Sequence, residues 1–221
     1  ALDQGMNFFD IDSSLQDLIT LYLPDDLRQH LTPHFKRLGE LAGNEIDEWS
    51  RLADRHSPIL HHRDPRGAWK DSLEFHPAYH ELMTIGREHG VHSLSWKNRG
   101  KKGAFVARSA LHYLYVQLEA GVACPMTMAH AAIPSLETSP AVAEQWVEPT
   151  LRDTYDPRML PPTQKTSTML GMAMTEKQGG SDVRANSTVA KPVADGAFEL
   201  WGHKWFCSAP MSDGFLTLAQ G

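Results

Sequence analysis

Residues 173–185 read AMTEKQGGSDVRA, and this stretch carries the most information about the fold. It starts as the end of a β-strand, places a hydroxyl and a carboxylate at Thr175 and Glu176, and then turns at Gly179-Gly180. Two adjacent glycines let the backbone bend tightly and bring bare N–H groups close to a ligand. Such amide-lined turns suit phosphate or carbonyl oxygens. A Gly-Gly turn is by itself usually only a turn, so the residues alone leave both interpretations open.

The sequence on both sides of this stretch has the two-residue period of β-structure. From Thr168 onward, apolar residues alternate with their neighbours at Leu170, Met172 and Met174. Further short strands are predicted at 188–190, 198–206 and 215–218, and Asp195-Gly196 predicts a hairpin turn. So small a sheet would have an unpaired edge and half a core. We therefore expect residues 166–221 to be only the first strands of an antiparallel β domain.

Residues 1–165 have helical spacing instead. Pro24, followed by two aspartates, is typical of a helix start. The apolar residues that follow at spacings of three and four line one face: Leu27, Leu31, Phe35 and Leu38. Pro33 lies inside this run, which leaves two short helices or one kinked helix as alternatives.

More helices are predicted along the same region. They cover 46–53, Pro77 to about Glu88, Ala104 to Ala120, and a segment after Ser139-Pro140. The helix from Ala104 should bury Phe105, Leu111, Leu114 and Leu118, whereas residues 56–75 have the composition of a loop. The sequence thus predicts an α+β protein with an all-helical domain at 1–165 and a partial β domain at 166–221.

Composition and charge exclude several classes of protein. The 221 residues carry 21 Lys and Arg against 27 Asp and Glu, a net charge of −6 that gives no general attraction to nucleic acid. No apolar run approaches the ~18–20 residues of a membrane span, and the start at Ala1–Gly5 has no leader pattern. Cys124 and Cys207 follow no disulfide spacing, which predicts a reducing compartment.

A second informative block, GHKWFCS, occupies residues 202–208. Together with residues 173–185 it resembles the acyl-CoA dehydrogenase family. The family signature runs small residue, aliphatic, Ser/Thr, Glu, two variable positions, small residue, Gly, Ser/Thr, Asp, two variable positions and small residue; every specified position is matched here. Residues 103–108, 119–121 and 124–128 are most similar to the AidB-type, adaptive-response branch. The resemblance covers most of the chain and implies an acyl-CoA dehydrogenase fold truncated before its carboxy-terminal helical domain.

This resemblance implies FAD as cofactor and gives roles to individual residues. Thr175 would lie at the pyrimidine end of the flavin, and Gly180 and Ser181 would face the pyrophosphate or the acyl-CoA entry. Phe206 would pack on the isoalloxazine ring, and the Ser208 hydroxyl would hydrogen-bond flavin N5. The complete cofactor-binding set is Met174, Thr175, Gly180, Ser181, Phe206, Cys207 and Ser208.

The second block departs from the family pattern at two positions. Most members have Trp and Thr where this chain has Phe206 and Ser208, but a flat apolar face and a hydroxyl are both retained. Trp205 would point to the opposite face of its strand, so we expect it in the core. The family's base is a Glu of the carboxy-terminal domain, so no catalytic residue is assigned in this chain. Glu176 belongs to the signature turn and is not assigned as the base.

Other candidate sites receive plainer interpretations. His76 and His80 are four residues apart but have no evident third ligand, so no metal site is expected, and His30/His34 and His61-His62 are treated likewise. Cys124 is expected to be a buried thiol, while the resemblance places residues 124–128 near the acyl pocket. The basic turn containing Lys97, Arg99, Lys101 and Lys102 is expected to be solvated.

Three functions remain open from the sequence. The first is FAD-dependent α,β-dehydrogenation of an acyl-CoA thioester, which implies fatty acid metabolism and an oxidoreductase that this piece alone would not complete. The second is a flavin-binding AidB-like protein that protects DNA against alkylation, with DNA contacts in the absent carboxy-terminal part. The third is a non-catalytic acyl-CoA-binding protein. The resemblance also implies a homotetramer and a cytoplasmic location, or a mitochondrial or peroxisomal one in a eukaryote.

Overall fold

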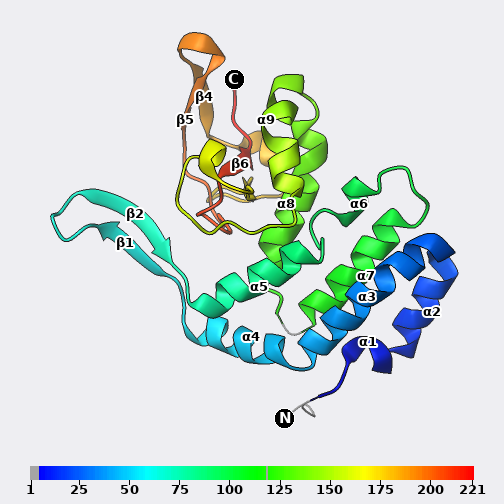
Figure 1. The fold of residues 1–221 in the computed structure, drawn as a ribbon. Helices are drawn as coiled ribbons and strands as arrows, with labels where there is room; N and C mark the ends of the chain where they lie inside the picture. Colours follow the sequence, from blue (N-terminus) through cyan, green and yellow to red (C-terminus); the bar gives the residue numbers. More distant parts are fainter. Residues whose placement is uncertain (1–4, 118) are drawn as a thin grey trace.

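The computed structural model describes residues 5–117 and 119–221 (Figure 1). The expectation about a leader at Ala1–Gly5 largely concerns residues outside this range, and so does the predicted burial of Leu118. Figure 1 shows one group of packed helices, with α8 and α9 running beside the short strands of the carboxy-terminal segment. No helix among the described residues is both long and apolar enough to cross a bilayer.

The first four helices are set by their amino-terminal caps. They are α1 (Phe8–Ile11), α2 (Ser13–Tyr22), α3 (Asp25–Ala42) and α4 (Glu45–Arg55). The Asn7 side chain accepts hydrogen bonds from two amides of α1, and Asp12 accepts one from Leu15 N of α2. In α3, the predicted apolar face of Leu27, Leu31, Phe35 and Leu38 is at most 4% exposed. Pro33 lies within this helix, which continues past it, so two separate helices are excluded.

A β-hairpin interrupts the helices where a loop was predicted, so the prediction of an all-helical domain is wrong here. Strands β1 (Ile59–Arg63) and β2 (Trp69–Glu74) pair antiparallel and project from the body (Figure 1). The turn depends on one side chain, because Asp64 Oδ1 accepts hydrogen bonds from the amides of Arg66 and Ala68. Both strands are mostly exposed, so they lack the apolar–polar alternation by which a half-buried strand is recognised.

Five helices follow the hairpin: α5 (Pro77–Glu88), α6 (Leu94–Lys97), α7 (Ala104–Val116), α8 (Ala123–Leu136) and α9 (Pro140–Leu151). The boundaries of α5 are as predicted. In α7 the burial of Leu111 and Leu114 is confirmed, but Phe105 is 55% exposed, so its predicted burial is wrong. The small residues Ala107 and Ala110 occupy the inward positions instead and allow close helix packing.

The carboxy-terminal strands form two pairs of opposite kind. β4 (Val189–Pro192) and β5 (Phe198–Trp201) make an antiparallel hairpin, and Asp195 and Gly196 at its turn have φ values of 61° and 73°. β3 (Leu170–Ala173) and β6 (Gly214–Thr217) pair parallel, which differs from the antiparallel pairing expected throughout. The intervening residues return the chain to the start of β3, so β6 runs in the same direction. The η1 (Pro162–Gln164), η2 (Val183–Ala185) and η3 (Ala194–Gly196) turns complete the segment.

Polar contacts attach this segment to the helices. The Arg87 side chain of α5 is fully buried and donates to the carbonyl oxygens of Arg152, Thr154 and Thr168, on the connection that leads to β3. Burial lowers the pKa of Arg87 to about 10, so the group remains cationic at neutral pH. A buried ion pair between Lys165 Nζ and Asp213 Oδ1, 2.7 Å apart, joins this connection to the residues just before β6. The β segment is therefore held in one position against α5, α8 and α9.

Candidate functional site

The signature stretch leaves β3 and turns back at once. Glu176 N donates to Gly179 O at 3.3 Å, and Gly179 N donates to Glu176 O at 2.9 Å. Gly179 has a φ of 143°, a backbone conformation that favours glycine. A Cβ on Gly180 would lie 2.6 Å from Thr175 Oγ1, so the second glycine allows the turn to close on Thr175. The signature thus brings two predicted site residues, Thr175 and Gly180, into contact.

The Glu176 carboxylate holds the two sequence blocks together. Oε1 accepts hydrogen bonds from the amide and hydroxyl of Thr188 and from Lys204 Nζ at 2.9 Å. Oε2 accepts them from the amide and hydroxyl of Ser187 and from Gln178 Nε2. The Thr188 hydroxyl and the Ser187 amide hold the pKa of this carboxyl far below its usual range. A carboxylate with these partners is an anionic anchor rather than a proton acceptor.

A backbone hydrogen bond joins the second block (202–208) to the signature (173–185). Trp205 N donates to Thr175 O at 2.8 Å. Phe206 has a φ of 60° and is 76% exposed, so its ring stands out from the surface with one face available for stacking. Trp205 is 46% exposed, so its predicted place in the core is wrong; the chain at 202–206 is not in a regular strand, and strict alternation does not apply.

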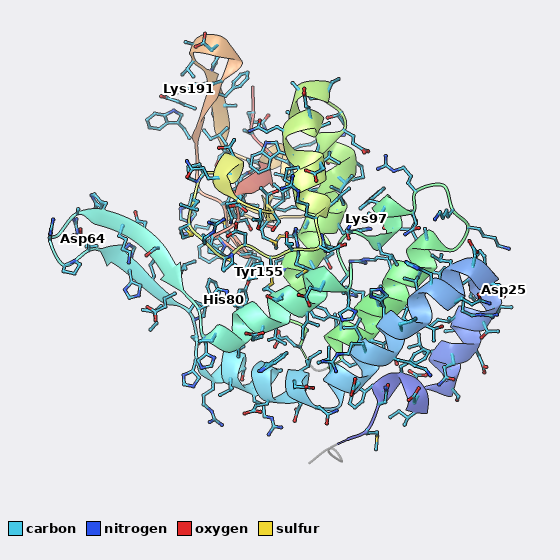
Figure 2. The ribbon with its side chains drawn as sticks, in the orientation of Figure 1. Asp25, Asp64, His80, Lys97, Tyr155 and Lys191 are labelled. Carbon is cyan, nitrogen blue, oxygen red and sulfur yellow. The ribbon has the colours of Figure 1, made fainter. Side chains whose placement is uncertain are left out.

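A cleft of about 360 Å³ lies between the second block and the helical region, and we call it the Ser208 cleft. Its lining residues come from the base of the hairpin, from α5, from α8 and the turn before it, and from residues 208–211: Pro58, Leu73, Phe75, Tyr79, Gly121, Cys124, Pro125, Ser208, Ala209, Pro210 and Met211. Cys124 is exposed in this cleft, so the prediction of a buried thiol is wrong. Nearby, on the helical side, His80 Nδ1 of α5 and Tyr155 Oη are 3.0 Å apart and face each other (Figure 2).

The predicted cofactor-binding residues do not all lie in one cavity. Ser208 lines the Ser208 cleft, whereas Cys207 lines a neighbouring cavity with Lys204 and Thr188. Met174 is half-buried and its carbonyl accepts from Asn186 Nδ2 at 3.1 Å. Ser181 is exposed on the turn beyond Gly180.

The arrangement fits a flavin in one respect that the structure itself provides. Within the described residues, the hydroxyls of Thr175, Ser181 and Ser208 have no hydrogen-bond partner, although their neighbours Ser187 and Thr188 are fully engaged by Glu176. Free hydroxyls on a surface fixed by a buried anchor are available to a polar ligand.

Sequence reasoning missed most of the partners that build this site. At Thr188 the sequence predicts only a short strand, and nothing in it marks Ser187 as a partner of Glu176. Leu73 and Phe75 lie in residues 56–75, which were predicted to be a loop. The one available signal was the paired presence of Glu176 and Lys204 in the two family blocks. The histidine pairs lie elsewhere: His76 Nδ1 accepts from Ala78 N as a helix cap, and no metal-binding group of three ligands exists among the described residues.

Comparison with known proteins identifies the family and agrees with this fold. Residues 3–157 match the family model of the adaptive response protein AidB N-terminal domain, and residues 171–221 match the acyl-CoA dehydrogenase middle domain. Two solved structures share the fold: the apo form of Bd2924, with a TM-score of 0.85 and 29% identity over 99% of this chain, and Caenorhabditis elegans ACDH-11 in complex with C11-CoA, with a TM-score of 0.84 and 27% identity over 97%. They cover this chain but are themselves covered only to 44% and 36%. The fold thus defines the class, a protein built like the amino-terminal and middle domains of an acyl-CoA dehydrogenase.

The curated relatives narrow the assignment. The AidB protein of Escherichia coli (strain K12), whose name assigns it only provisionally to the acyl-CoA dehydrogenases, is 47% identical over 182 residues, 82% of this chain. Acyl-CoA dehydrogenase family member 11 of Caenorhabditis elegans is 29% identical over 95% of this chain. The chain belongs to the acyl-CoA dehydrogenase family, in its AidB branch. It spans about a third of the length of both relatives, 34% in each case.

Proposed function

We propose that the whole protein is an FAD-dependent oxidoreductase that desaturates an acyl-CoA thioester between its α and β carbons. The observation that carries the proposal is the Glu176 anchor, which fixes both family blocks while leaving the hydroxyls of Thr175 and Ser208 free. Bound FAD would accept the β-hydrogen as hydride. The residues described below would bind and orient the partners.

In this proposal, each signature residue holds a defined part of the cofactor. Thr175 binds the pyrimidine end, and Gly180 with Ser181 faces the pyrophosphate or the acyl-CoA entry. Phe206 offers its exposed ring to the isoalloxazine, and the Ser208 hydroxyl donates to N5. Met174 and Cys207 contribute the chain on either side of these contacts.

The proposed acyl group occupies the Ser208 cleft. Its walls include the stacked rings of Phe75 and Tyr79, whose centroids are 4.2 Å apart, and these would give a thioester placed beside Ser208 an apolar surface to pack on. No residue of this chain is proposed as the base that removes the α-proton. Glu176 does not serve because its oxygens accept hydrogen bonds and its pKa lies far below the usual range.

Flavin reduction tests this proposal. We expect the purified full-length protein to be yellow, and a panel of acyl-CoA thioesters to bleach its flavin absorbance under anaerobic conditions. Ser208→Ala should slow bleaching because it removes the hydroxyl beside N5, whereas Ser212→Ala, at a residue that belongs neither to the flavin set nor to the lining of the Ser208 cleft, should leave it unchanged. A bound flavin that no acyl-CoA reduces would contradict the proposal. Salt-dependent retention on duplex DNA would then favour protection of DNA against alkylation.

We also propose that the full-length protein is a cytoplasmic homotetramer with the flavin at a subunit and domain boundary. Residues 1–221 alone would then hold FAD weakly, because contacts from the rest of the assembly are missing. Tight stoichiometric binding of FAD to residues 1–221, measured by equilibrium dialysis, would contradict this arrangement.

A further inference from the structure

A second cleft adjoins the Ser208 cleft on the helical side. This second cleft, which we call the α4–α5 cleft, has a volume of about 490 Å³. The two share four wall residues, namely Pro58, Phe75, Tyr79 and Gly121. A chain that starts beside Ser208 and passes the stacked rings of Phe75 and Tyr79 would therefore reach the α4–α5 cleft.

The far end of this path is polar, although its neck is apolar and aromatic. The polar residues that line the α4–α5 cleft are Ser50, Arg51, Asp54, His56, His76 and Glu119. Glu119 is half-buried, accepts from Val122 N at 3.1 Å and accepts from Ser50 Oγ at 3.3 Å. The rings of His56 and His76 stack with centroids 4.7 Å apart. An apolar chain end would leave these groups without new partners.

The charges of the cleft select the kind of polar group it accepts. Among the described lining residues, Glu119 and Asp54 contribute two carboxylates, while the guanidinium of Arg51 pairs with Asp47. A ligand carboxylate would therefore meet like charge. A neutral hydroxyl fits both kinds of neighbour, because it can donate to the Glu119 carboxylate and accept from an imidazole N–H.

We propose that the α4–α5 cleft is a distal subsite for the acyl chain, and that the favoured substrates are acyl-CoA thioesters with a hydroxyl group at or near the far end of the chain. This assignment rests on the proposed function, since it takes the Ser208 cleft as the place of the thioester. Glu119 is the specificity-determining residue, and Phe75 and Tyr79 form the neck that only the hydrocarbon part of the chain occupies.

Binding of matched acyl-CoA thioesters to the full-length protein tests the subsite. Three series with equal carbon number are compared by calorimetry, carrying a terminal methyl, a terminal hydroxyl or a terminal carboxyl group. At the chain length that spans both clefts, we expect the hydroxyl compound to bind about tenfold more tightly than the methyl compound, the effect of about one net hydrogen bond to a charged group. The carboxyl compound should bind most weakly.

A matched pair of variants locates the effect. Glu119→Leu should reduce the preference for hydroxyl over methyl to about one. Glu81→Leu, which changes an exposed glutamate of α5 that lines neither cleft, should keep it. Equal or tighter binding of the methyl series by the unmodified protein at every length overturns the subsite, and so does a preference that survives Glu119→Leu.

Flavin bleaching on the same compounds separates this inference from the proposed function. If methyl-terminated thioesters bleach the flavin and the hydroxyl gives no advantage, the dehydrogenase stands and the distal subsite is wrong. If no thioester bleaches the flavin while the hydroxyl series still binds more tightly, the subsite stands and the dehydrogenase is wrong. If no thioester binds, both are wrong.

Discussion

The helical region and the carboxy-terminal β segment are stabilised in different ways. In α3 the apolar residues Leu31, Phe35 and Leu38 are at most 1% exposed and belong to a core shared by α1 to α8. In β5, by contrast, Phe198, Leu200 and Trp201 are 55–60% exposed. The β segment obtains its geometry from Glu176, whose oxygens accept six hydrogen bonds, and from the buried pair of Lys165 and Asp213. Hydrophobic packing therefore holds the helical region and seats β3 against α8, whereas a polar network sets the signature turn and the second block, which carry the proposed flavin contacts.

The largest expected effect is a cavity in the helical core. Phe35→Ala removes a ring with 0% exposure that stacks on Phe9, and we expect it to lower the free energy of unfolding by about 3–5 kcal/mol. The matched change Leu200→Ala in β5 should stay within about 0.5 kcal/mol because that side chain is 55% exposed. Urea denaturation of residues 1–221, followed by far-UV circular dichroism, measures both. Equal losses would show that β5 is packed as tightly as α3.

The second effect concerns the polar network. Glu176→Gln replaces one acceptor oxygen with a donor that faces the donors of Ser187, Thr188 or Lys204. We expect amide hydrogen exchange at Thr188 and Trp205 to accelerate by more than about tenfold, while exchange in α3 is unchanged.

The exposed Asp182, changed to Asn, serves as the control for Glu176→Gln because its side chain holds no other part of the signature. If exchange in α3 accelerates together with that at Thr188, the two regions are one cooperative unit and the contrast between them fails.

The elements predicted correctly are those in which local signals and burial agree. Pro24 and the two aspartates begin α3, Pro77 begins α5, and the three-and-four spacing of Leu27 to Leu38 marks the buried face. Asp195-Gly196 likewise forms the predicted turn, because its positive φ values are a property of these two residues.

Two kinds of element were missed. One depends on a single side-chain hydrogen bond within a turn, and the other on pairing between residues far apart in the sequence. The hairpin of β1 and β2 depends on the Asp64 side chain, and the parallel pairing of β3 with β6 joins residues more than forty positions apart. In α7, Phe105 and Ala107 both fit an inward face, and only packing against the neighbouring helices decides which is buried.

The site was foreseen only in part for the same reason. The two family blocks predict roles for Thr175, Gly180 and Ser208, but the partners of Glu176 at Ser187 and Thr188 are set by the folded chain. The exposure of Cys124 and the clefts that meet at Phe75 and Tyr79 also arise from the packing of separate elements, which no local pattern encodes.

A moderate effect should appear when the pH is lowered, and it belongs to the helical region. His34 Nδ1 and His89 Nδ1 are 3.1 Å apart, so one Nδ1 donates its N–H and the ring that accepts must be a neutral imidazole. Burial, and then the neighbouring His34 and Arg37, lowers the pKa of His89 to about 4, and burial also lowers that of His34. Between about pH 6.5 and 4 the unfolded chain therefore binds more protons, so stability is present above about pH 6.5 and is lost as the pH falls.

The variant His89→Gln isolates this contribution. We expect its melting temperature to lie below that of the unmodified chain at pH 7 and the difference to shrink as the pH approaches 4, because only the unmodified chain loses the neutral pair. A difference in melting temperature that stays constant from pH 7 to 4 would mean that the histidine pair binds no extra protons when the chain unfolds.

The smallest expected effect compares the two exposed hairpins, one from each region. The guanidinium of Arg63 lies 3.9 Å from the ring centroid of Trp69 in β2, and Lys191 Nζ lies 5.1 Å from that of Trp201 in β5. Cation–π contacts at exposed sites are worth about 0.5–1 kcal/mol, and an isolated two-stranded hairpin is marginal in water. Trp69→Ser and Trp201→Ser should each lower the free energy of unfolding by less than about 1 kcal/mol. A much larger loss for Trp69→Ser alone would mean that the β1–β2 hairpin folds with the helical core, because only coupling to buried residues could make an exposed ring contribute so much.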